Sequence, residues 1–138
     1  HARYDEFVSD DPITRGVVPE DLSGNTLTKA PTWRLNLGLQ HEFMLGSLGT
    51  LTRRVQFRYE DDVYLREFNK PTDVQGSFTK TDLVITYRSP GERFFVAAYG
   101  NNLEDEQVRK SMGNLPGHGL VYSLEAPRTY GVRAGFDF

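Results

Sequence analysis

The stretch Arg128–Phe138, RTYGVRAGFDF, decides the fold of this chain. Its residues alternate without a break between apolar side chains and small or polar ones. The apolar set is Tyr130, Val132, Ala134, Phe136 and Phe138. Because successive side chains of a β-strand point to opposite faces of a sheet, this period of two predicts a strand with one apolar and one polar face.

Other parts of the chain alternate in the same way, or nearly so. They are Ala2–Val8, Thr32–Phe43, Thr50–Tyr64, Asp82–Ser89 and Arg93–Asn101. The last of these is apolar on both parities, so its sequence does not show which of its side chains lie on which face of the sheet. No stretch carries a convincing helical stripe, and we interpret Asn102–Met112 as a loop. The pattern predicts an all-β fold, an antiparallel up-and-down meander of about six long strands.

The connections between these strands come in two sizes. Met44–Gly49 and Ser89–Glu92 are tight turns that contain Gly or Pro. The long polar connections are Ser9–Pro31, Leu65–Lys80 and Asn102–Pro127. Short and long connections alternate, so all tight turns would lie at one end of the meander. Compact soluble domains seldom carry such loops, whereas outer-membrane β-barrels have short periplasmic turns and long extracellular loops.

The composition narrows the class of protein. The 138 residues have a formal net charge of −3, which argues against a nucleic-acid partner. The absence of cysteine excludes disulfides and thiolate metal sites. The opening HARYDEFV lacks Met and already alternates, so it is either a trimmed end or the interior of a longer protein. We expect the second.

Alternation alone does not say which face is buried, because a soluble half-buried sheet and a membrane barrel share it. Three features favour the barrel. The longest stretches have about 11–14 residues, enough for a tilted strand to cross a bilayer. Aromatic residues such as Trp33 and Phe43 lie near strand ends, as in interfacial girdles. The polar parity mixes Arg with Glu and Gln, which suits a lumen.

Three stretches resemble the C-terminal end of a TonB-dependent outer-membrane receptor. They are Leu22–Phe43 (LSGNTLTKAPTWRLNLGLQHEF), Tyr99–Glu106 (YGNNLEDE) and Ala126–Phe138 (APRTYGVRAGFDF). Each motif is short, but the three together and in this order are fairly specific. The likeness covers nearly the whole chain.

The resemblance implies a 22-stranded transmembrane barrel in a Gram-negative outer membrane, with an N-terminal plug in its lumen. It implies import of a scarce substrate, a ferric siderophore, a cobalamin or a carbohydrate, driven through the TonB complex. The plug, the TonB box and the earlier strands are not among these residues, so residues 1–138 correspond to the C-terminal part of the barrel. The implied partners are lipid, the rest of the barrel, the plug and the barrel-assembly machinery, with no cofactor.

The resemblance also assigns a role to the closing strand. In the family, the last strand carries the signal by which the barrel is recognised for assembly. In this chain that signal corresponds to Tyr130, Val132, Ala134, Phe136 and Phe138.

Individual ligand-binding residues are unknown from the sequence. The candidates are Arg34, Arg54 and Arg58, which share the parity expected to face the lumen. They would contact the plug, pair across strands, or guide an anionic substrate. We expect the three long loops to contact substrate.

Arg53 falls on the apolar parity, and it would count against a membrane barrel if it lay deep in lipid. A charge at the bilayer midplane would cost about 2–4 kcal/mol. Since Arg53 follows a tight turn, we expect its side chain to snorkel to the interface.

The remaining polar residues predict no enzyme. His41 is interpreted as an interfacial histidine and His118 as a loop histidine, without metal-ligand spacing. The acidic groups Ser9–Pro12, Glu60–Asp62 and Glu104–Glu106 are interpreted as solvated loops. No catalytic motif is readable. The alternatives left open are another outer-membrane barrel of the porin or adhesin type and a soluble lipocalin-like barrel.

Overall fold

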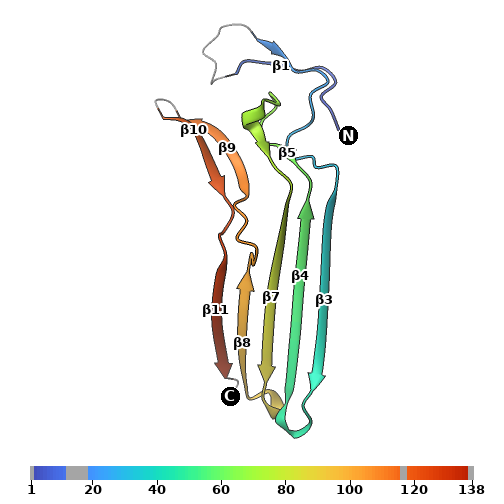
Figure 1. The fold of residues 1–138 in the computed structure, drawn as a ribbon, viewed down its shortest axis with the longest axis vertical. Helices are drawn as coiled ribbons and strands as arrows, with labels where there is room; N and C mark the ends of the chain where they lie inside the picture. The colour runs from blue at the N-terminus through green and yellow to red at the C-terminus, as the bar shows by residue number, and fades with distance from the viewer. Residues whose placement is uncertain (1, 12–18, 116–117, 137–138) are drawn as a thin grey trace. The chain divides into compact units, whose positions relative to one another are not determined.

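The computed structural model describes residues 2–11, 19–115 and 118–136, and these residues form an all-β fold (Figure 1). None of the helices in the described part is long and apolar enough to cross a membrane. The chain divides into two compact units, which we describe separately. Unit 1 comprises His1–Arg34, Glu60–Phe78 and Gln107–Glu125, and unit 2 comprises Leu35–Tyr59, Thr79–Glu106 and Ala126–Phe138.

A five-stranded sheet forms the body of unit 2, in the order β11-β8-β7-β4-β3. Its strands are β3 (Arg34–Met44), β4 (Thr50–Glu60), β7 (Phe78–Arg88), β8 (Phe94–Asn101) and β11 (Thr129–Phe136). Each strand lies beside the next long strand along the chain, and the arrows alternate in direction (Figure 1). The predicted up-and-down meander is therefore confirmed.

Both predicted tight turns are present in unit 2 as short 3-10 turns. They are η1 (Gly46–Leu48), between β3 and β4, and η3 (Pro90–Glu92), between β7 and β8. Gly49, which follows η1, has φ +97, and a Cβ atom there would overlap the carbonyl oxygen of Arg88. Only glycine fits this close backbone approach.

The register of β8 settles the facing that its sequence left open. In the antiparallel pair with β11, Phe95 lies opposite Gly135, Ala97 opposite Arg133 and Tyr99 opposite Gly131. Directly opposed residues share a face. Phe95, Ala97 and Tyr99 therefore lie on the polar face, together with Arg133.

The other face of the sheet is apolar and uncovered within unit 2. Leu39 and Val132 are each 72% exposed, and Phe136 is 73% exposed. Unit 2 is a single layer, so it has no second layer to bury this face, as a soluble sandwich would. Such an extended apolar surface indicates contact with lipid or with another protein.

Unit 1 is built from short paired strands. β1 (Val8–Ser9) pairs with β2 (Glu20–Asp21), β5 (Val63–Tyr64) with β6 (Val74–Gln75), and β9 (Arg109–Leu115) with β10 (Gly119–Leu124). A 3-10 turn, η2 (Pro71–Asp73), lies between β5 and β6. The buried apolar side chains of unit 1 are Leu22, Val63, Leu65, Phe68, Phe78 and Val108.

Two sequence-based expectations differ from the structure in unit 1. The stretch Ala2–Val8 forms no long strand: its regular pairing in the described residues is the Arg3–Thr26 bridge and the start of β1, with further single backbone hydrogen bonds to residues 22–27. The main sheet accordingly has five long strands, where the alternation predicted about six. The long connection Asn102–Pro127, expected to be irregular, contains the β9–β10 hairpin.

Candidate functional site: a basic pocket on the polar face of the sheet

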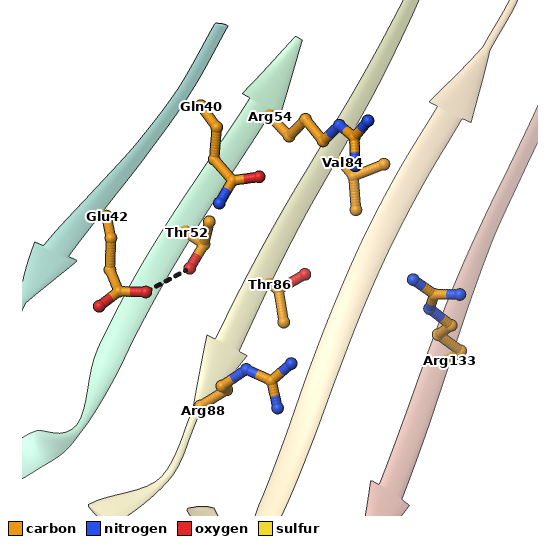
Figure 2. A pocket seen from close by; sticks show the side chains of 8 residues that line it. All are labelled: Gln40, Glu42, Thr52, Arg54, Val84, Thr86, Arg88 and Arg133. Atoms are coloured by element: carbon orange, nitrogen blue, oxygen red, sulfur yellow. Dashed lines mark hydrogen bonds between the residues drawn. The ribbon is translucent and has the colours of Figure 1, made fainter. Parts of the chain in front are cut away.

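The polar face of unit 2 contains a pocket of about 300 Å³. It lies over the half of the sheet that is nearer the tight turns. Figure 2 shows the side chains that line it, which rise from β3, β4, β7 and β11. The lining residues are Gln40, Glu42, Thr52, Arg54, Val84, Thr86, Arg88 and Arg133.

The strands place these side chains by simple alternation. Gln40 and Glu42 are two residues apart on β3, and Thr52 and Arg54 are two apart on β4. The Thr52 hydroxyl donates a hydrogen bond of 3.3 Å to Glu42 Oε2, which joins the two strands across this face (Figure 2).

Positive charge dominates the pocket, because its lining includes three guanidinium groups and one carboxylate. That carboxylate, Glu42, already accepts the Thr52 hydroxyl. The Arg88 guanidinium carbon lies 5.7 Å from the centroid of the Phe95 ring. Within residues 2–11, 19–115 and 118–136, Arg54 and Arg133 make no hydrogen bond or ion pair.

This arrangement can bind an anion but offers no acid–base pair. Exposed guanidinium groups hold carboxylate or phosphate oxygens through paired N–H donors. No group of three or more His, Cys, Asp or Glu side chains that could hold a metal ion occurs in the described part of the chain. The charge of the lining therefore suits a negatively charged group.

The three candidate arginines have different surroundings. Arg54 lines the pocket. Arg34 instead pairs with Glu60, with 3.0 Å between Nε and Oε2. Arg58 is half-buried and does not line the pocket. Sequence reasoning did not select Arg88 and Arg133, because only the lateral order of β4, β7, β8 and β11 shows that they share this pocket with Arg54.

The proposed assembly-signal residues share the opposite face of the sheet. Tyr130, Val132, Ala134 and Phe136 alternate along β11 and are exposed. Their register partners are Gly100, Ala98, Val96 and Phe94. Phe138 lies outside the described residues. The assembly role of this set stays a prediction.

Two predicted loops are tied together in unit 1 by a network of ion pairs. Arg66 Nη2 lies 2.5 Å from Asp11 Oδ1, and Arg66 Nη1 lies 3.6 Å from Asp73 Oδ1. Lys70 Nζ lies 2.7 Å from Asp11 Oδ2 and 3.2 Å from Glu20 Oε1. The hydrogen bond to Asp11 raises the pKa of Lys70, against an opposing effect of burial.

The expectation of solvated acidic loops was therefore wrong for Asp11. Its side chain is only 2% exposed and accepts from two cations. No local pattern could predict this, because the partners Arg66 and Lys70 lie more than 50 residues away along the chain.

The YGNNLEDE stretch comprises the end of β8 and an ordered turn that follows it in unit 2. Asn102 is 3% exposed. Its side chain accepts from the Glu106 N–H at 3.0 Å and donates to the carbonyl of Ala126 at 3.3 Å. Its own N–H donates to Asp82 Oδ1 at 2.8 Å. Asn102 also has φ +53, a backbone conformation that asparagine tolerates better than most residues.

Glu104 and Asp105 complete this turn. The Thr81 N–H donates to Glu104 Oε2 at 2.7 Å, and the Thr81 hydroxyl donates to Oε1. Burial raises the pKa of Glu104, but these hydrogen bonds outweigh it and hold the pKa below its ordinary value. Asp105 Oδ2 lies 3.4 Å from Arg128 Nη2. Both carboxylates thus have structural partners.

Comparison with known proteins gives matches among solved structures. The chain is similar to the ferric yersiniabactin uptake receptor FyuA from Yersinia pestis, with 21% identity, a TM-score of 0.73, and coverage of 87% of this chain and 19% of that one. It is also similar to BauA, the ferric preacinetobactin receptor from Acinetobacter baumannii, with 24% identity, a TM-score of 0.63, and coverage of 85% and 16%. No family model and no curated protein sequence matches.

These likenesses show the fold. The chain has the fold of a C-terminal barrel segment of such receptors, and the family resemblance of the sequence is confirmed at that level. The chain spans about a fifth or less of the receptors it matches.

Proposed function

We propose that this chain is the C-terminal barrel segment of a TonB-dependent receptor that imports a ferric siderophore through a Gram-negative outer membrane. One observation carries the proposal: the chain, which includes a single-layer meander with one apolar and one charged face, matches a ferric uptake receptor over 87% of the chain's length. In this assignment the apolar face contacts lipid and the charged face lines the lumen.

The substrate class rests on the structural neighbours. Both are receptors for ferric complexes. The three long connections, which include the β9–β10 hairpin, would lie at the extracellular end and contact the ferric siderophore. The chain itself would perform no catalysis and need no cofactor.

The basic pocket has a place in this function. It is lined by residues from the half of each strand nearer the tight turns, which is the periplasmic half in such barrels. Arg54, Arg88 and Arg133 would there hold acidic side chains of the plug. An extracellular ligand site would lie toward the long connections instead.

The test uses the intact protein that contains this chain, in its own cell. We expect it in the detergent-extracted outer-membrane fraction. We also expect deletion of its gene to abolish uptake of one ⁵⁵Fe-labelled siderophore from a panel, and loss of TonB to have the same effect. Labelled cobalamin and labelled maltodextrin serve as control substrates.

Two results would contradict the proposal in different ways. Recovery of the protein in the soluble fraction would exclude a membrane barrel. Recovery in the outer membrane with uptake that persists without TonB would indicate a passive channel of the porin type.

A further inference from the structure

The apolar face of β3, β4 and β7 carries one cation named in the sequence analysis, Arg53. Its guanidinium carbon lies 4.5 Å from the centroid of the Phe43 ring, a cation–π arrangement. Among the residues that the structure describes, Arg53 makes no ion pair. A positive charge therefore stands on a hydrophobic surface without an anionic partner.

Arg53 lies at the edge of a hollow of about 420 Å³ on this face. The hollow is lined by Leu39, His41, Arg53, Val55, Leu83 and Ile85. No carboxylate is among these residues. Apart from Arg53 and His41, the lining is aliphatic.

The polar and aliphatic residues of the hollow lie at different heights along the strands. His41 and Arg53 are nearer to η1, since β3 ends at Met44 and β4 begins at Thr50. Leu39 on β3 and Val55 on β4 lie farther from the tight turn, and Leu83 lies in the middle of β7. A ligand that fits both parts has an anionic head toward the turns and an apolar tail toward the middle of the sheet.

We propose that this hollow binds one anionic phospholipid of the periplasmic leaflet. Arg53 would donate to the phosphate, with His41 beside it, and an acyl chain would lie against Leu39, Val55 and Leu83. A guanidinium group binds phosphate oxygens through paired N–H donors. The negative charge of the phosphate would compensate the positive charge of Arg53. The inference rests on the proposed function, because it requires this face to contact lipid.

Arg53 and Arg54 provide a matched pair of variants. They are consecutive on β4 and point to opposite faces, one to the hollow and one to the basic pocket. Arg53→Gln removes the cation from the lipid face. Arg54→Gln makes the same chemical change on the lumen face and serves as the control.

Native mass spectrometry of the intact detergent-purified protein measures the bound lipid. The probes are dioleoylphosphatidylglycerol and dioleoylglycerol, which lacks the phosphate. We expect wild type and Arg54→Gln to retain phosphatidylglycerol over dioleoylglycerol. We expect Arg53→Gln to retain about tenfold less phosphatidylglycerol, as for a lost charge-assisted hydrogen bond.

Three results would overturn the lipid site. The first is equal retention of phosphatidylglycerol and dioleoylglycerol by the wild type, a result that needs no variant. The second is equal retention of phosphatidylglycerol by Arg53→Gln and Arg54→Gln. The third is a lipid-free dimer of the wild type that dissociates in Arg53→Gln. The last would assign the hollow to a second copy of the chain. Each leaves the receptor function standing, because that function is judged by membrane fractionation and TonB-dependent uptake.

Discussion

The ring of Tyr99 lies directly over Gly131, its register partner across the β8–β11 pair. A Cβ atom at Gly131 would overlap the Tyr99 ring and hydroxyl. Phe95 covers Gly135 in the same way, four residues along each strand. Two aromatic side chains of β8 thus pack on two glycines of β11. This packing fixes the register of the pair.

Gly131→Ala is expected to destabilise the sheet by about 1–3 kcal/mol, because the added methyl group forces the Tyr99 ring from its position. The measurement is urea unfolding of the detergent-purified intact protein. The control is Gly38→Ala, since a Cβ atom at Gly38 in β3 meets no atom within 4 Å. Tyr99→Ala in the Gly131→Ala background should remove most of the clash. An equal loss for Gly38→Ala and Gly131→Ala would show that the ring contact does not matter.

Asp11→Asn is expected to weaken the loop network of unit 1 by about 3 kcal/mol, because it leaves the buried Arg66 cation undercompensated. The sensitive site is the Leu65 N–H, which donates to the Asp73 carbonyl at 2.8 Å. Its hydrogen exchange should accelerate. The neighbouring Asp10 is exposed, so Asp10→Asn is the control and should leave this exchange rate unchanged.

The Glu104 turn should depend on pH in a defined direction. Hydrogen bonds from Thr81 hold the pKa of Glu104 below its ordinary value, despite the opposing effect of burial. A carboxyl group with a lowered folded-state pKa stabilises the fold above its unfolded-state pKa, and this contribution is lost as the pH falls through the folded-state pKa.

Amide exchange of Leu103 reports on this turn, because its N–H donates to the Thr81 carbonyl at 3.0 Å. We expect protection, after correction for intrinsic exchange, to fall on acidification in the wild type. Glu104→Gln should flatten this dependence. Glu106→Gln is the control, since its backbone, not its side chain, makes the hydrogen bonds in the turn. A pH dependence that survives in Glu104→Gln would assign the effect to another group.

Reversal of charge in the basic pocket should loosen the proposed plug. The double variant Arg54→Glu, Arg133→Glu places carboxylates where acidic plug side chains would bind. The expected result is greater sensitivity of cells to vancomycin, which a plugged barrel excludes, at unchanged receptor abundance. Lys110→Glu, on the exposed surface of β9, is the control. Unchanged sensitivity of the double variant would argue that the plug is held elsewhere.

Local sequence was enough to predict the long strands and the tight turns. Alternation identifies β3, β4, β7 and β11, because one side of each strand is apolar and the other polar. Gly and Pro identify η1 and η3, because each requires a backbone that few residues adopt. The same reasoning failed at Ala2–Val8, where a short alternating run occurs outside any long strand.

The pocket and the ion-pair network depend on contacts between residues that are far apart in the sequence. Arg54, Arg88 and Arg133 lie on three strands, and only the lateral order of those strands brings them to one pocket. The burial of Asp11 depends on Arg66 and Lys70, which belong to another loop. No local sequence pattern predicts the grouping of the three arginines or the burial of Asp11.

By itself, the sequence determined the period of two, the positions of the tight turns and therefore an up-and-down meander with a charged and an apolar face. These properties follow from the geometry of the strand and the conformations that each residue allows. Only the tertiary structure decided the facing of β8, the aromatic rings over Gly131 and Gly135, and the separation of Arg53 from Arg54 into two different sites. The physical reason is that register is a relation between strands, and it is set by how side chains of distant segments pack against one another.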